Sequence, residues 1–260
     1  MLNPMAKTTV TRRENSEIAP NEIHVRLFGP LELENRWGHV IENRARSSVC
    51  WLLLKYLLTD PTRPVTTEEA REMLWPCDAD IDHDGAARVR LRRLRNALTP
   101  LQLGGTSGLV LYGGGEYLLN TVYKLHTDET RFREISEKLR RGVEESEGLD
   151  LCREALELYR GEFMEFTEDA SWLTAYRAAY HRELAFVARE TLTRTARQAD
   201  EELMALLCRT TATLIPEDEE LHRAVINRLM EERKEVQLVR YAALLARAGE
   251  RAAWLNGAKL

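Results

Sequence analysis

The spacing of hydrophobic residues in the first half of the chain changes repeatedly between that of strands and that of helices. Residues 24–33 (HVRLFGPLEL) have apolar side chains at alternate positions on both sides of a Gly-Pro pair, which predicts two strands joined by a turn. A further short strand is predicted at 40–42 (VIE). In residues 45–58 the apolar positions instead form one helical stripe, and a following Asp-Pro pair is expected to end this helix.

A second helix is predicted over residues 66–75 (TTEEAREMLW). Thr66 and Glu69 have the spacing of a capping box, in which a Thr hydroxyl and a Glu carboxylate each bond the other residue's backbone N–H group. Three apolar residues are expected on the buried side of this helix: Ala70, Met73 and Leu74.

A third helix is expected over residues 84–98, and it combines an apolar stripe with a cluster of arginines. The apolar residues that recur at helical spacing predict one buried face, formed by Ala87, Leu91, Leu94 and Leu98. Val89 stands away from this face and is expected to be exposed. The other positions carry five arginines in eight residues, namely Arg88, Arg90, Arg92, Arg93 and Arg95.

A hairpin is predicted next, over residues 108–119 (GLVLYGGGEYLL). Two alternating stretches flank three consecutive glycines, and glycine is the residue that tight hairpin turns favour. The turn is expected at Gly113, Gly114 and Gly115.

No strand is predicted after residue 126, where the apolar spacing becomes helical throughout. The lengths and spacings of these helices resemble helix-turn-helix pairs of the tetratricopeptide type, although no consensus repeat is present. The predicted helices are Thr130–Arg141, Ser146–Tyr159, Ser171–Arg197, Glu201–Ile215, Glu217–Glu231 and Glu235–Ala248.

Composition and length favour a soluble cytoplasmic protein of two domains. The chain has 260 residues, of which 30% are charged and 44% hydrophobic. Its longest apolar run, at 49–54, is far too short to cross a membrane, and the polar segment 1–21 is expected to be disordered rather than a secretory signal. The four cysteines lie far apart without a CxxC pair, so reduced thiols are expected rather than a zinc module or a disulfide framework.

The charge is distributed unevenly along the chain. Residues 1–127 carry 16 Lys/Arg and 15 Asp/Glu, whereas residues 128–260 carry 21 and 27. Because neither half is strongly basic, a nucleic-acid surface must be a local patch, and the arginine cluster is the one candidate that the sequence offers.

The arginine-rich helix has two interpretations, a solvated charged face and a DNA-reading surface. No acidic residue lies between Arg88 and Ala97, so no pair of residues four apart within this stretch neutralises the arginines. Two predicted helices precede this helix and a glycine-tipped hairpin follows it, as in a winged helix-turn-helix domain. An exposed Val89 among arginines suits contact with a thymine methyl group. These features favour DNA binding.

Several motifs resemble those of one regulator family. WLLLKYLLTDPTRPVTTEEAREMLW, RVRLRRLRNAL and GEYLL resemble the winged-helix output domain of OmpR/PhoB-type response regulators, with VRLFGPLEL in place of the family's leading strands. ALELYRGEFM and WLTAYRAAYHREL resemble the bacterial transcriptional activator domain. In this order the two domains resemble the SARP family of transcriptional regulators, over roughly residues 23–250.

This resemblance implies a mixed fold: an N-terminal α+β winged helix-turn-helix domain (22–126) followed by an all-α, tetratricopeptide-like bundle (127–260). It implies an activator that binds direct repeats in double-stranded promoter DNA, as a homodimer on the DNA, and recruits RNA polymerase through its sigma or alpha subunit. Such a protein is expected in the cytoplasm, associated with the nucleoid. The DNA-contacting residues that it implies are Arg88, Arg90, Arg92, Arg93, Arg95, Gly113 and Gly114.

The sequence departs from the family's pattern in the predicted wing, which offers Glu116 where the family usually has a basic residue for the minor groove. Minor-groove contact would then depend on backbone amides of the glycines. A second interpretation of the whole chain therefore stays open, namely a helical adaptor or anti-activator that acts through protein contacts and has a winged helix of weak DNA affinity.

The acidic stretch 78–85 (DADIDHDG) has three interpretations. A calcium loop of the EF-hand type needs Gly at its sixth position and Glu at its twelfth, which here are His83 and Val89, so calcium is not expected. Asp84 could cap the third helix. In the family that the chain resembles this loop faces RNA polymerase, which implies a polymerase contact at Asp78, Asp80 and Asp82.

The sequence offers no candidate for catalysis, a metal or a cofactor. It contains no GxxxxGK[ST] phosphate loop, and its six histidines form neither HxxxH nor HExxH. The aromatic residues Trp172, Tyr176 and Tyr180 recur at helical spacing and are interpreted as core packing rather than a ligand cage.

Overall fold

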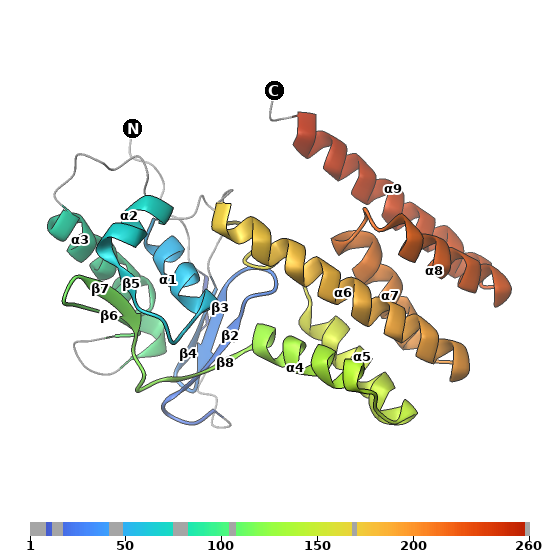
Figure 1. The fold of residues 1–260 in the computed structure, drawn as a ribbon, viewed down its shortest axis with the longest axis horizontal. Helices are drawn as coiled ribbons and strands as arrows, with labels where there is room; N and C mark the ends of the chain where they lie inside the picture. Colours follow the sequence, from blue (N-terminus) through green and yellow to red (C-terminus); the bar gives the residue numbers. More distant parts are fainter. Residues whose placement is uncertain are drawn as a thin grey trace. The chain divides into compact units, whose positions relative to one another are not determined.

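The computed structural model describes residues 9–11, 18–41, 49–74, 83–103, 108–167 and 171–257 (Figure 1). The chain divides into two compact units, each of which takes two segments of the sequence. The first unit comprises residues 1–128 and 163–175, and the second comprises residues 129–162 and 176–260.

The first unit contains a five-stranded sheet. The strands β1, β4, β3 and β2 are antiparallel neighbours, and β8 joins β2 in parallel. Ile23 and Val25 of β2 point into the core while His24 and Arg26 face solvent, which is the alternation that the sequence predicts. The strands are β1 (Thr9–Thr11), β2 (Glu22–Arg26), β3 (Glu32–Asn35), β4 (Gly38–Ile41) and β8 (Lys124–Thr127).

Two of these strands were not expected from the sequence. Disorder was predicted across residues 1–21, but Thr9–Thr11 forms β1 and pairs with β4, so the prediction is wrong for these three residues. Their Thr-Val-Thr sequence is β-branched throughout, which suits a strand. In β8 the side chains are exposed or half-buried, so its sequence lacks the alternation that marks a strand.

Three helices and a small second sheet complete the winged helix-turn-helix fold of the first unit. The helix α1 (Val49–Thr59) contacts both α2 (Thr67–Leu74) and α3 (His83–Ala97). A 3₁₀ turn (Thr99–Leu101) follows α3. The second sheet has the order β5-β7-β6, in which β6 and β7 form the predicted hairpin; its strands are β5 (Val65–Thr66), β6 (Val110–Gly113) and β7 (Glu116–Leu119).

After the chain has formed the first two helices of the second unit, the segment 163–175 returns to the first unit. Phe163 forms a β-bridge with Phe28, and their rings meet edge to face with centroids 5.9 Å apart. The ring of Trp172 lies 5.1 Å from that of Tyr56 in α1. The division of the chain at residue 128 falls two residues from the boundary expected at 126, but the return of this segment was not expected.

The second unit is an all-helical, tetratricopeptide-like bundle of three consecutive helical hairpins. Within it α7 contacts α5, α8 and α9, and α8 also contacts α9. The predicted helices are confirmed to within a few residues, except that α9 continues past Ala248. In chain order the helices are α4 (Asp128–Arg141), α5 (Glu145–Leu158), α6 (Ser171–Arg197), α7 (Glu201–Leu214), α8 (Glu219–Glu231) and α9 (Glu235–Gly257).

Over the described ranges, no helix combines the length and apolar character that crossing a membrane requires. The three cysteines whose positions are described, Cys50, Cys152 and Cys208, are buried free thiols.

Candidate nucleic-acid interface

Helix α3 is held to the first unit by its leucines. Leu91, Leu94 and Leu98 are 4%, 1% and 4% exposed, and the helix contacts α1 and the 3₁₀ turn behind it. The predicted buried stripe is confirmed for these three residues, whereas the side chain of Ala87 lies outside the described part. Burial of three leucines fixes the rotation of α3 about its axis.

The opposite side of α3 is a cationic surface. Arg88, Arg92, Arg93 and Arg95 are exposed and Arg90 is half-buried, so the five predicted arginines do not share one environment. Val89 is 37% exposed, as its position off the leucine stripe predicts. A helix with this division of side chains can offer guanidinium groups and one apolar contact to an anionic partner.

Three of these arginines lack an ion pair within the described residues: Arg88, Arg92 and Arg93. Elsewhere in the same unit exposed arginines do find carboxylates. Arg63 lies 2.7 Å from Glu69, and Arg26 lies 3.2 Å from Glu32. The charge of α3 is therefore less neutralised, over the part of the chain that the structure describes, than charge on neighbouring elements.

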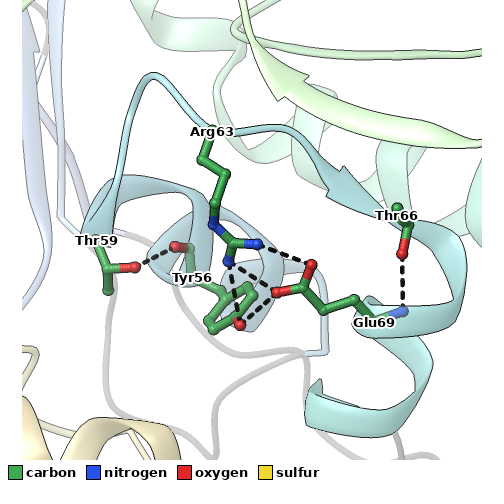
Figure 2. Close-up of polar contacts among 5 residues, drawn as sticks. All are labelled: Tyr56, Thr59, Arg63, Thr66 and Glu69. Carbon is green, nitrogen blue, oxygen red and sulfur yellow. Dashed lines mark hydrogen bonds and ion pairs between the residues drawn. The ribbon is translucent and has the colours of Figure 1, made fainter.

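A polar cluster ties α1 to α2 through the loop between them (Figure 2). Arg63, in the connecting loop, donates two hydrogen bonds to the carboxylate of Glu69, at 2.9 and 2.7 Å. The hydroxyl of Tyr56 in α1 donates to the same carboxylate at 2.6 Å, and the guanidinium lies over the Tyr56 ring at 5.7 Å. Such a bidentate, charge-assisted arrangement fixes the angle at which α2 leaves the loop.

The cluster shifts the pKa of each of its members in the direction that keeps it intact. The hydrogen bonds from Arg63 lower the pKa of Glu69 below its ordinary value. Burial, together with the hydrogen bond to Glu69, raises the pKa of Tyr56, and the carboxylate raises the pKa of Arg63. The carboxylate therefore stays ionised and the phenol neutral over the whole physiological range.

Two details of α2 differ from the prediction. The Thr66 hydroxyl accepts the N–H of Glu69 at 3.1 Å, which is one half of a capping box. The Glu69 carboxylate turns instead to Arg63 and Tyr56, two partners that helical spacing does not reveal. Ala70 and Leu74 are buried as expected, but Met73 is 38% exposed, so its predicted burial is wrong. An eight-residue helix has too few turns to bury a wide stripe.

The hairpin turn is attached to the start of α2. Gly114 and Gly115 have φ angles of +64° and +83°, the pair of left-handed conformations that a two-residue hairpin turn requires. The carbonyl of Gly115 accepts hydrogen bonds from the backbone N–H and the hydroxyl of Thr67, at 2.9 and 2.8 Å. A Cβ added at Gly113 or Gly114 would meet nothing within 4 Å, so the tip of the hairpin is open.

Other sequence-predicted site residues are not brought to this surface. Asp78, Asp80 and Asp82 lie outside the described residues, as does the side chain of Asp84. Among the residues that are described, no group of three His, Cys, Asp or Glu side chains could hold a metal ion. Trp172 is buried as predicted, while Tyr176 and Tyr180 of the same stripe are only half-buried.

The comparisons with known proteins bear on the second unit. Residues 127–250 match the family model described as the bacterial transcriptional activator domain. The fold thus defines a protein with a winged helix-turn-helix followed by a helical domain of this kind. Regulators of the SARP type have this order of domains, and the chain is similar to them in that order.

One solved structure shows a distant likeness. Mycobacterium tuberculosis EmbR, in complex with a low-affinity phosphopeptide, aligns at 14% identity over 90% of this chain and 71% of the EmbR chain, with a TM-score of 0.47. A likeness this slight does not bear on the function of the present chain. No curated protein sequence matches the chain.

Proposed function

We propose that the chain is a sequence-specific DNA-binding activator of transcription that uses α3 as its recognition helix. The observation that carries the proposal is the division of α3 between three buried leucines and an arginine surface whose members Arg88, Arg92 and Arg93 lack ion pairs among the described residues. A helix held in this way can enter the major groove, which is wide enough to admit it.

The side chains of α3 suit two kinds of contact. A guanidinium can bond the O6 and N7 atoms of guanine through two parallel hydrogen bonds, or it can bond a phosphate through a charge-assisted hydrogen bond. Val89 offers an apolar surface of the kind that contacts a thymine methyl group. In the wing, Gly113 and Gly114 would approach the backbone or minor groove through their amides, because Glu116 supplies no positive charge.

The proposal extends to how transcription is activated. Two copies of the chain would bind a direct repeat in promoter DNA, and each would read one half-site. Asp78, Asp80 and Asp82, between α2 and α3 in the sequence, would then meet basic residues of a sigma or alpha subunit of RNA polymerase. The carboxylates have the charge that such a contact needs.

The test of DNA binding is a mobility-shift titration of the full chain against its own upstream region at several salt concentrations. Because each phosphate contact releases counterions, affinity should fall steeply between about 50 and 200 mM salt. Failure to shift the DNA at any salt concentration would contradict the proposal and favour the adaptor interpretation, in which the helical unit acts through protein partners.

The arrangement of two copies has its own test. Moving one half-site by about five base pairs turns it to the opposite face of the duplex, so cooperative binding should be lost if the copies touch. Equally tight binding to the displaced site would show that the two copies bind independently.

A further inference from the structure

A groove of about 870 Å³ runs along the second unit between α5, α7 and α9. These are the second helices of the three consecutive hairpins, and α7 lies in contact with both of the others (Figure 1). Each helix contributes residues at helical spacing, such as Glu202, Ala205, Leu206 and Arg209 of α7, so the groove follows one face of each helix.

The groove has an apolar floor and a cationic rim. Leu206 and Leu244 are half-buried and supply the floor. The rotation of α9 is fixed by Tyr241, which is 1% exposed and whose hydroxyl lies 2.6 Å from Nδ1 of His222. Four arginines of the lining face two glutamates, Glu157 and Glu202; the arginines are Arg153, Arg209, Arg240 and Arg247.

Most of this positive charge lacks a carboxylate partner among the residues that the structure describes. Arg153 lies 2.5 Å from Asp200, but Arg209, Arg240 and Arg247 are exposed and form no ion pair with any described residue. Several arginines elsewhere in the second unit do pair, namely Arg131 with Glu154, Arg140 with Glu183, and Arg189 with Asp218. Arg223 and Arg233, which lie outside the groove, also form no ion pair with a described residue. In a half of the chain that carries an excess of acidic residues, the groove gathers three such arginines along one surface.

Within the described part of the chain, one polar atom in the lining also lacks a hydrogen-bond partner. The side-chain oxygen Oε1 of Gln237 is buried and accepts no hydrogen bond from the described residues. A buried acceptor left without a donor is unfavourable, and a ligand that brings an N–H group would satisfy it.

We propose that this groove binds an acidic segment of a partner protein that also carries apolar side chains. Arg240 and Arg247 are seven residues apart on α9, which separates them by about 10 Å along the helix axis. Charges spread over this length suit carboxylates spaced along a peptide better than one compact anion. The apolar floor accepts side chains between them.

A nucleic acid fits the groove less well. The glutamates Glu157 and Glu202 would face a continuous line of phosphates, and Leu206 and Leu244 offer nothing to a sugar-phosphate backbone. The proposed peptide site depends only on the second unit, so it does not rest on DNA binding by α3.

The test is a selection of random peptides of about 12 residues, displayed on phage, against the full chain; a helical peptide of this length spans about 18 Å. The parent should enrich peptides that combine Asp or Glu with apolar residues. The enriched peptide, labelled with a fluorophore, should bind at least about tenfold more weakly to the double variant Arg240→Glu/Arg247→Glu, because two attractive charges become repulsive.

A matched control reverses two other exposed arginines of the same unit, Arg223→Glu/Arg233→Glu, which do not line the groove. This control should bind the peptide like the parent. Arg209→Ala, which leaves no new charge, should weaken binding in the same direction as the double variant.

Three results would overturn the proposal. The first is that no acidic peptide is enriched, and the second is that the groove variants bind the peptide as tightly as the parent. The third is that a single-stranded oligonucleotide of equal charge displaces the labelled peptide at the same concentration as the unlabelled peptide does. The last result would identify a nucleic-acid site instead. Retained helical circular dichroism in each variant shows that a loss of binding is not a loss of fold.

Discussion

The Nζ atom of Lys55, in the middle of α1, donates a hydrogen bond of 2.7 Å to the hydroxyl of Thr167, which lies 112 residues further along the chain. Lys55 is fully buried, and Thr167 is 6% exposed. A buried ammonium needs hydrogen-bond partners, and here the returning segment 163–175 supplies one of them. The core of the winged helix is therefore completed by residues that follow the first helical hairpin of the second unit.

Replacing Phe163 with Ala should destabilise the first unit by about 3–5 kcal/mol, because the ring is 1% exposed and its loss leaves a cavity against Phe28. Urea denaturation followed by tryptophan fluorescence measures this, since Trp37, Trp51 and Trp172 belong to that unit. Val122→Ala, at a side chain that is 66% exposed, is the control and should change little. Parental stability in the Phe163 variant would show that the returning segment does not complete the core.

Leu94→Ala should cost about 2–5 kcal/mol of stability, because Leu94 is 1% exposed and lies on the buried face of α3. Val89→Ala on the same helix is the matched control, and a loss within about 0.5 kcal/mol is expected for its exposed side chain. Thermal or urea denaturation of the two variants compares them directly. Equal losses would mean that α3 is rotated relative to the arrangement described above.

The hairpin turn can be tested at two adjacent glycines. Gly114 has a φ of +64°, so Gly114→Ala should destabilise the wing by about 1–2 kcal/mol, the cost of a left-handed conformation for a residue with a Cβ. Gly113 lacks a positive φ and an added Cβ there meets nothing within 4 Å, so Gly113→Ala should be neutral or slightly stabilising. Urea denaturation midpoints that fall by the same amount in both variants would contradict the turn geometry.

The stability of the second unit should depend on the protonation of His181. Its Nε2 lies 2.6 Å from Glu162 and its Nδ1 lies 3.3 Å from Glu217. Burial acts to lower the pKa of His181, but the two carboxylates outweigh burial and the pKa is raised. Because the folded-state pKa exceeds that of the unfolded chain, this stabilisation is complete below the unfolded pKa and is lost as the pH rises through the raised pKa.

Urea denaturation followed by far-ultraviolet circular dichroism across this pH window measures the effect. The parent should lose stability as the pH rises, and His181→Gln should flatten that dependence. Glu162→Gln should flatten it as well, because it removes the nearer carboxylate. An unchanged slope in the His181 variant would assign the pH dependence to other groups.

Local periodicity is what made most of the fold predictable from the sequence. The leucine stripe of α3 needs only the 3.6-residue repeat, and Leu91, Leu94 and Leu98 are buried as that repeat requires. The glycine turn was likewise predictable, because positive φ angles at Gly114 and Gly115 depend on residue type. The helices of the second unit follow from the same local rules.

Features that depend on distant partners were not predictable. β8 has no apolar alternation of its own, and it becomes a strand because Leu125 lies beside Ile23 of β2. Glu69 was expected to complete a capping box, but Arg63 and Tyr56 offer its carboxylate stronger, charge-assisted hydrogen bonds. No spacing rule in the sequence brings these three residues together.

The measurement that tests the central claim most directly is the affinity of the full chain for its upstream DNA when single arginines of α3 are removed. Arg92→Ala and Arg93→Ala should each weaken binding by about 1–3 kcal/mol while leaving stability unchanged, because both side chains are exposed and lie off the leucine stripe. Arg26→Ala is the control, since Arg26 is half-exposed on β2 and paired with Glu32. This variant should bind the DNA with the affinity of the parent. If the Arg92 and Arg93 variants bind the DNA as tightly as the parent and the control, α3 is not the recognition helix.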